Sequence, residues 1–280
     1  MSKLLNLIIL ASKYSPIEKP QTIKEKIEQI NKLYDIIPFF SNENNSMLFI
    51  MAVSFAIPVY STRMISHGLN HIVDVLYNCK LLLSNWKDNI IITDEMKKII
   101  FLVALFHDYS DSKYDKYGIH ELALKKWLRE NINEDADMIY KIIYNISFSK
   151  EKKNRDLDPT FSWDYIFPNQ NDMIIRHVVS DADKLAAIGT NGIIRCIYYN
   201  FERYFEENPE LSFDKLSYKQ YIELYRNDVL IYVDKLFLIN KEYIFTLAGK
   251  IYGEMYEKEM IGDRENLLDF IHVLENYIPK

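Results

Sequence analysis

Glycine and proline are scarce in this chain, and their scarcity limits the folds that it can adopt. Among 280 residues there are 7 glycines and 8 prolines. Tight turns and hairpins are built largely from these two residue types, so a sheet of many strands would need more of them. Long helices joined by short loops need fewer. The sequence therefore predicts an all-α fold, and a chain of this length can bury a sizeable core.

Apolar residues recur at spacings of three and four along many segments, which is the pattern of amphipathic helices. In residues 22–37 the pattern is carried by Ile23, Ile27, Ile30, Leu33 and Ile37. We expect further helices at about 47–60, 71–83, 95–106, 119–129, 136–146 and 174–188, and a Tyr-rich helical region over 200–280. Residues 150–171 combine mixed charge with prolines and aromatic side chains, and they are expected to form a long loop.

Charge and composition exclude some classes of partner. The net charge of −6 argues against a surface that holds a long nucleic acid, because phosphate backbones are bound by clusters of Lys and Arg. No segment approaches the roughly 20 apolar residues needed to span a bilayer. The opening MSKLLNLIILAS is like the apolar part of a signal peptide, but it is short and lacks a clear small-x-small cleavage pattern. Cys79 and Cys196 are too few for a disulfide framework, which suits a reducing compartment. We therefore expect a cytoplasmic protein with neither a membrane nor a long nucleic acid as partner.

Residues with metal-ligand chemistry stand at the ends of apolar segments. In FLVALFHDYSDSKY (101–114), an apolar run is followed directly by His107 and Asp108. His71 stands near the start of another apolar helix, and Asp183 lies in a third. Imidazole nitrogens and carboxylate oxygens together suit divalent Mn, Mg, Fe, Ni or Zn, and two His with two Asp leave positions open on a six-coordinate ion. These four residues form a candidate metal site; for His71 the alternative is a hydrogen-bonded core histidine.

Four segments occur in an order that resembles a known family. They are HGLNHIVDV (67–75), ALFHDYSDSKY (104–114), NISFSKEK (145–152) and DADKLAAIGTNGIIR (181–195). Together they are similar to the motifs of the HD superfamily of metal-dependent phosphohydrolases, and most similar to its small stand-alone branch. The segment KLFLINKEYIFTLAGKIYGEMYEKEM (235–260) resembles the C-terminal helical part of that branch. The likeness covers about residues 65–262 and leaves the first 60 outside.

The resemblance implies an HD-domain-like helical bundle with additional N- and C-terminal helices. We expect an N-terminal helical extension over 1–60, an HD metal-binding core over 61–200 and a C-terminal helical part over 201–280. The last part would pack on the core, so that the whole forms one compact domain.

Roles for individual residues also follow from the resemblance. It implies that the metal ligands are His71, His107, Asp108 and Asp183, with Asp181 as the alternative to Asp183. Asp111 matches the acidic residue after the His-Asp pair and would act with Asp108 in catalysis, as a general acid or base. A side chain that caps a turn is the alternative for Asp111.

The residues expected to bind substrate are Lys113, Lys184, Arg195 and His67. Each of the three cationic side chains would contact phosphate, and a solvated charge is the alternative for each. His67 lies one helical turn before His71 and would support a ligand or contact substrate, or else cap a turn. One departure concerns Asp74, which stands where the family often has Arg, so phosphate would be held differently here.

The expected function is metal-dependent hydrolysis of a small phosphorylated molecule, with a nucleotide as the favoured substrate. The favoured ion is Mn²⁺ or Mg²⁺, and Fe, Ni and Zn also fit the donors. Two alternatives stay open. One is a phosphodiesterase that cleaves a cyclic or short oligonucleotide, and the other is a non-catalytic HD-type helical binding module. The sequence indicates no particular oligomeric state.

Overall fold

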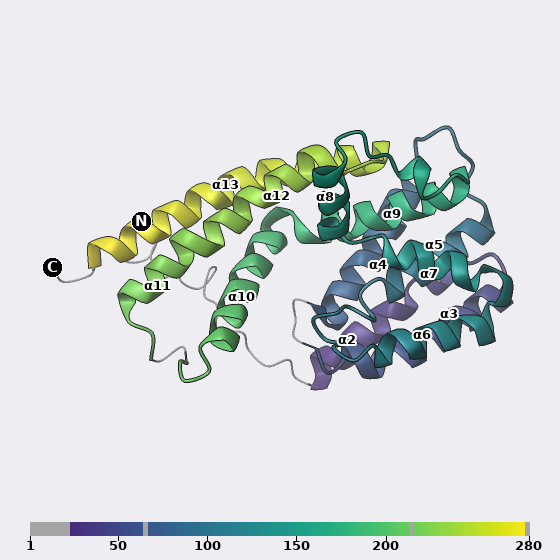
Figure 1. Ribbon diagram of the computed structural model, residues 1–280, viewed down its shortest axis with the longest axis horizontal. Coiled ribbons are helices and arrows are strands. Elements are labelled where there is room, and N and C mark those ends of the chain that lie inside the picture. The colour runs from purple at the N-terminus through teal and green to yellow at the C-terminus, as the bar shows by residue number, and fades with distance from the viewer. Residues whose placement is uncertain (1–22, 64–66, 213–214, 278–280) are drawn as a thin grey trace. The chain divides into compact units, whose positions relative to one another are not determined.

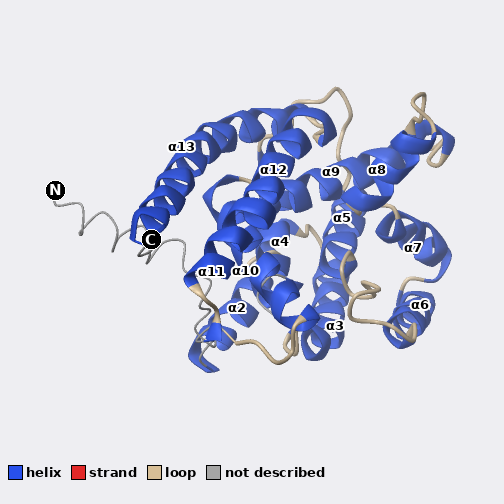
Figure 2. Cartoon of the chain, turned by 60° about the vertical axis from the view of Figure 1, so that its left-hand side comes forward, coloured by secondary structure: helices blue, strands red, loops and turns tan. Residues whose placement is uncertain are grey.

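The computed structural model describes residues 23–63, 67–212 and 215–277. Within these ranges every regular element is a helix and no strand is present (Figure 2). The expected all-α fold is therefore confirmed. The signal-like opening MSKLLNLIILAS lies outside the described residues.

The chain forms two compact units. The first unit comprises the described residues within 21–186 and 243–250, and it carries His71, His107, Asp108 and Asp183. Its helices, labelled in Figure 1, are α2 (Ile23–Tyr34), α3 (Glu43–Tyr60), α4 (Leu69–Ser84), α5 (Asp94–Phe106), α6 (Ile119–Asn131), α7 (Ala136–Tyr144), α8 (Phe148–Leu157) and α9 (Gln170–Ala187). Short 3-10 turns lie at Ile37–Phe39, Asn133–Asp135 and Trp163–Tyr165.

Helix α5 forms the centre of the first unit. Thr93 caps its first turn by accepting the backbone N–H of Met96, and every residue from Ile99 to Phe106 is buried. The helix contacts α3, α4 and α7. Burial of a large apolar side chain contributes about 1.5–3 kcal/mol, so the end of α5 is held firmly against the core. His107 follows directly and takes its position from that end.

Helix α3 belongs to this core, although it lies in the part of the chain expected to form a separate extension. It buries one residue on nearly every turn and contacts both α2 and α5. The expected boundary at residue 60 is therefore not a boundary in the structure, because α2 and α3 share a unit with His71. The second unit likewise begins at residue 187 and not at residue 201.

The long loop expected over 150–171 is wrong for its first part, since Phe148–Leu157 forms α8, whereas residues 158–169 do form a loop with one short 3-10 turn. Helix α8 is mostly charged, so the spacing of apolar residues could not indicate it. Lys, Glu and Arg have favourable helix propensities. Ion pairs four residues apart, at 2.6 Å each, join Lys152 to Asp156 and Arg155 to Glu151. Such pairs support a helix that has no apolar stripe.

The second unit comprises the described residues 187–242 and 251–277. It contains α10 (Gly189–Glu207), α11 (Tyr218–Leu224), a π-helical turn (Tyr225–Val229), α12 (Leu230–Tyr243) and most of α13 (Leu247–Tyr277). The expected helical region is confirmed. At Gly192 the backbone passes so close to the preceding helix end that a Cβ atom would lie 2.0 Å from the carbonyl oxygen of Ala187.

No helix in the described part of the chain is long and apolar enough to cross a membrane. Cys79 and Cys196 are both buried, and both are free thiols.

Candidate metal centre

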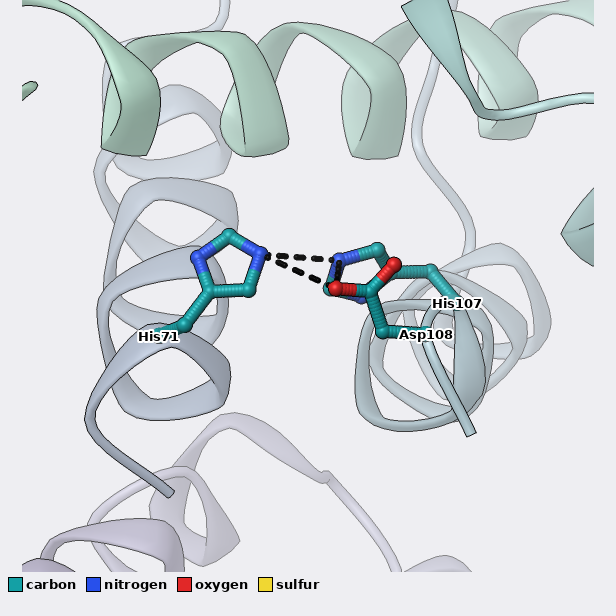
Figure 3. A group of neighbouring side chains, drawn as sticks. All are labelled: His71, His107 and Asp108. Carbon is teal, nitrogen blue, oxygen red and sulfur yellow. Dashed lines mark hydrogen bonds and ion pairs between the residues drawn. The ribbon is translucent and has the colours of Figure 1, made fainter. Parts of the chain in front are cut away.

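Two helices of the first unit bring His71, His107 and Asp108 together (Figure 3). His71 lies in the first turn of α4, and its side chain is 2% exposed. His107 is the residue directly after α5, and Asp108 follows it in the turn. The three side chains point toward one another from their two backbones (Figure 3). Because α5 is buried along its length, the backbone at the start of this turn is held in a fixed position.

The donor atoms of four residues converge. The Nε2 atom of His71 lies 3.2 Å from Nε2 of His107, 3.3 Å from Oδ1 of Asp183 and 3.5 Å from Oδ2 of Asp108. Nε2 of His107 lies 3.6 Å from Oδ2 of Asp108 and 3.7 Å from Oδ1 of Asp183. Asp183 comes from α9, so three helices of one unit supply the cluster.

These separations fit donors that share one divalent ion. With bonds of about 2.1 Å, donors at right angles around an ion lie about 3.0 Å apart and donors on opposite sides about 4.2 Å apart. The five separations that involve a histidine all fall within this range, and the donor atoms of His71, His107 and Asp108 all lie within 4.8 Å of one another. Two neutral imidazoles and two carboxylates also balance the charge of a divalent ion. The His and Asp groups of this unit could therefore hold a metal ion.

The tautomer of His107 suits this role. Its Nδ1 atom lies 2.8 Å from the carbonyl oxygen of Ala104, which can only accept a hydrogen bond. Neutral His107 therefore carries its proton on Nδ1, and the lone pair of Nε2 faces the cluster. A partner on the far ring nitrogen is the usual way in which a protein orients a ligating imidazole.

The two carboxylates of the cluster are ionised at neutral pH. Burial alone would raise the pKa of Asp108, but His107, a hydrogen bond with His67, and His71 together hold that pKa well below its usual range. Burial alone would likewise raise the pKa of Asp183. There a hydrogen bond from His71 and the nearby His107 lower the pKa below its ordinary value. Both groups are therefore present as carboxylates, the form that binds metal ions.

His67 lies against one of the ligand candidates. Its Nδ1 atom is 3.3 Å from Oδ2 of Asp108. Donor atoms of His67, Asp108 and Asp111 also lie within 4.8 Å of one another, which makes a second group that adjoins the first and shares Asp108. An imidazole that binds a ligating carboxylate fixes the orientation of that carboxylate. The structure thus places His67 beside the cluster, as a support for Asp108.

Asp111 and Lys113 lie on the turn that follows the ligand pair. Oδ1 of Asp111 accepts the backbone N–H of Lys113 at 2.9 Å, so this carboxylate does cap a turn. Asp111 also lies beside the cluster, because its donor atom is within 4.8 Å of donor atoms of His67 and Asp108. The side chain of Lys113 is exposed. Both residues remain candidates for contact with a substrate.

Asp181 has a different role from Asp183, although only one residue separates them. It is fully buried, and its carboxylate accepts the backbone N–H groups of Phe245 (3.0 Å) and Thr246 (2.7 Å) and the hydroxyl of Thr246 (2.8 Å). Burial raises the pKa of Asp181 to about 6, although Lys184 and these hydrogen bonds lower it. Asp181 therefore anchors the start of α13, and Asp183 is the residue of this pair that faces the two histidines.

Lys184 is placed where it does not reach a substrate. Its side chain is 2% exposed, and Nζ donates to Glu151 (3.1 Å), Ser180 (2.8 Å) and the carbonyl oxygen of Tyr243 (2.7 Å). An ammonium group has three donors, so all of them are used inside the protein. The expected phosphate contact of Lys184 is corrected to a structural role. The reason is that the same face of α9 is covered by α8, which the sequence did not reveal.

Arg195 and His177 are not among the donor residues of the cluster, and the expected phosphate contact of Arg195 stays a prediction. Arg195 lies on α10, in the second unit, and so in a different compact unit from the cluster. His177, which lies near Asp183 in sequence, is stacked on the ring of Phe245 with centroids 4.1 Å apart. Burial, together with the charge of neighbouring Arg176, lowers the pKa of His177 to about 3, so this imidazole is neutral. It packs against Phe245 inside the unit.

Two important residues were not identified from the sequence. Glu151 is fully buried and pairs with Arg176 (2.7 Å) as well as with Lys184. It lies within the segment NISFSKEK, so the motif could have drawn attention to it. Arg63 donates two hydrogen bonds to the turn that carries Asp108. It lies outside every quoted motif, and no sequence signal indicated it.

In comparisons with known proteins, no family model matches this chain, and neither a curated protein nor a solved structure is similar enough to count as a match. The family resemblance therefore rests on the sequence motifs quoted above.

Proposed function

We propose that this protein is a metal-dependent phosphohydrolase of the HD type, which acts on a small phosphorylated substrate. The observation that carries the proposal is the convergence of donor atoms from His71, His107, Asp108 and Asp183 at 3.2–3.7 Å. Three separate helices supply these residues. The same four positions are those that the HD motifs would assign to the metal.

Four protein donors leave open positions on a six-coordinate ion, and Mn²⁺ or Mg²⁺ is the ion that we favour. When bound, such an ion polarises a phosphoryl oxygen and lowers the pKa of a water molecule. The protein keeps the donor groups in the protonation states and orientations that bind a metal ion. Asp108 and Asp183 stay ionised, and Ala104 keeps the lone pair of His107 directed at the cluster.

Asp111 is the group that we assign to proton transfer. It adjoins Asp108 and His67, and its position is fixed by the hydrogen bond from the backbone of Lys113. A carboxylate held in this way can take a proton from an attacking water. Lys113, on the exposed side of the same turn, can steady the negative charge of a phosphate group. Lys184 has no part in this scheme, because its donors are used inside the protein.

A nucleotide is the substrate class that we favour. The net charge of −6 is unfavourable for a long nucleic acid, whereas a small phosphorylated molecule needs only a local site. We place the protein in the cytoplasm, since its free, buried cysteines fit a reducing compartment.

The test is a panel of nucleotides and phosphate esters, supplied to the purified protein with Mn²⁺ or Mg²⁺ and analysed by mass spectrometry. The products distinguish monoester, pyrophosphate and diester cleavage, so the panel also tests the alternative of a phosphodiesterase. We expect metal-stimulated release of phosphate, pyrophosphate or nucleoside from at least one nucleotide. No turnover of any compound with any of the fitting ions would contradict the proposal.

The alternative of a non-catalytic helical module has one observation in its favour, the presence of Asp74 where the family often has Arg. In that case the ion would only stabilise the fold. Chelation would then lower the melting temperature while no substrate turned over. Turnover that is lost in Asp183→Ala, with the fold retained, would exclude the module.

A further inference from the structure

Arg63 holds the turn that carries two of the four ligand candidates. Its Nη1 atom donates to the carbonyl oxygen of Asp108 at 2.6 Å, and Nη2 donates to the carbonyl oxygen of Tyr109 at 2.7 Å. Both carbonyl groups belong to the turn that follows α5, and that of Asp108 also accepts the backbone N–H of Asp111 at 3.0 Å. The planar guanidinium fork can satisfy two neighbouring acceptors at once. A positive charge is also favourable at the C-terminal end of a helix.

The side chain of Arg63 is itself held in place. Its guanidinium carbon lies 4.8 Å from the ring centroid of Tyr114 and 5.2 Å from that of Tyr60. Tyr60 is buried, and its hydroxyl donates to the carbonyl oxygen of Leu105 at 2.7 Å. The ring of Tyr114 meets the ring of His67 edge to face. Arg63 therefore connects the end of α3 to the turn after α5 through contacts of defined direction.

We propose that Arg63 is a positioning residue of the metal centre. Its two hydrogen bonds fix the backbone at Asp108 and Tyr109, and this backbone sets the direction in which the Asp108 carboxylate points. Arg63 acts through these carbonyl groups, to which it donates one hydrogen bond from each of its two Nη atoms. The inference rests on the proposed metal site, and it adds a residue that lies outside the motifs.

The position of Arg63 distinguishes its role in the metal centre from a general contribution to the stability of the fold. Arg63 is partly exposed, whereas the buried core around α5 is built from apolar side chains that do not include it. Loss of the two hydrogen bonds from the Arg63 guanidinium should therefore loosen the turn at Asp108 and Tyr109 more than it lowers the free energy of unfolding. Removal of a group that orients a metal ligand typically lowers metal affinity by about 10–100-fold.

The test compares Arg63→Met and Arg63→Lys with the wild type. Mn²⁺ affinity is measured by calorimetry, the ligand geometry by the visible spectrum of the Co²⁺-loaded protein, and the fold by the melting temperature in EDTA. We expect Arg63→Met to weaken Mn²⁺ binding by at least about tenfold and to change the Co²⁺ spectrum. Arg63→Lys, which can donate to one carbonyl but lacks the fork, should weaken binding less. Arg129→Met, at an exposed arginine of the same unit, is the matched control and should bind as the wild type does.

Each result decides the matter. Wild-type Mn²⁺ affinity and an unchanged Co²⁺ spectrum in Arg63→Met would overturn the inference and leave the proposed function intact. If Arg63→Met fails to fold, Arg63→Lys provides the same readouts, and wild-type values there would overturn the role of the fork. A wild-type protein that binds none of these ions would overturn both this inference and the proposed function.

Discussion

The Nε2 atoms of His71 and His107 lie 3.2 Å apart, although 36 residues separate them in the chain. Both side chains are only 2% exposed. Two imidazole nitrogens this close cannot both carry a proton, and Asp183 and Asp108 face them at 3.3–3.7 Å. A divalent ion would satisfy all four groups at once. The protein should therefore be more stable with the ion than without it.

Mn²⁺ should raise the melting temperature of the wild type but not that of Asp183→Ala. Binding at a concentration one hundred times Kd stabilises the folded state by about 2.7 kcal/mol. In EDTA, Asp183→Ala should be less stable than the wild type at neutral pH, because the lowered pKa of Asp183 shows that its contacts with His71 and His107 outweigh the repulsion from Asp108. The measurement is thermal unfolding with and without the ion. Asp137→Ala, at a highly exposed carboxylate, is the control. An equal Mn²⁺ shift in Asp183→Ala would exclude this residue as a ligand.

Glu151→Gln should destabilise the protein by about 3–5 kcal/mol, because it leaves the buried cations of Arg176 and Lys184 without their counter-charge. The free energy of unfolding in urea gives the value. Lys152→Met, which removes one partner of an exposed pair in the same helix, should leave that free energy nearly unchanged. A loss for Glu151→Gln as small as that of the control would show that the buried charges do not depend on Glu151.

Asp181 should make stability fall as the pH rises from about 4 to 6. Burial raises its pKa to about 6 in the folded protein, above the ordinary value of 3.8. The folded state therefore holds a proton that the unfolded state releases in this window, and the contribution present below pH 4 is lost above pH 6. A difference of about two pKa units corresponds to about 3 kcal/mol. The measurement is the free energy of unfolding of the wild type minus that of Asp181→Asn, in EDTA. A difference that stays constant between pH 4 and 6.5 would contradict this account.

Two helical glycines of the second unit should respond in opposite directions to alanine. At Gly192 a Cβ atom would lie 2.0 Å from the carbonyl oxygen of Ala187, so the backbone must move and Gly192→Ala should destabilise the protein. At Gly262 no atom lies within 4 Å of the added Cβ. Gly262→Ala should stabilise the protein by about 0.5–1 kcal/mol, the difference in helix propensity. Denaturant midpoints of the two variants measure both effects. A stabilising Gly192→Ala would show that the close approach is not real.

Much of the fold could be predicted from the sequence, because buried helices leave a periodic apolar pattern. Helix α5 and the residues directly after it are an example: the expected helix 95–106 agrees with Asp94–Phe106. Helix α8 could not be predicted, since it is held by ion pairs and not by an apolar face. The part played by α3 also could not be predicted, because an apolar segment does not reveal which other helix it contacts.

The donor residues of the site could be proposed from their chemistry, but their neighbours could not. The motif that contains Asp183 also contains Asp181 and Lys184. Two of the three partners of Lys184, Glu151 and the carbonyl oxygen of Tyr243, come from distant positions in the chain. Only the tertiary structure shows that Lys184 points into the protein. Arg63 acts on the backbone of other residues, and a contact of that kind has no sequence pattern.

The central claim is that the cluster of His71, His107, Asp108 and Asp183 holds the ion on which catalysis depends. The most direct measurement follows nucleotide hydrolysis as Mn²⁺ is returned to protein stripped with EDTA, alongside the number of ions bound. Our account predicts that activity rises in proportion to occupancy of the site, and that Asp183→Ala keeps its helical spectrum but loses both binding and turnover. Hydrolysis that persists at full rate in the stripped protein or in Asp183→Ala would contradict it.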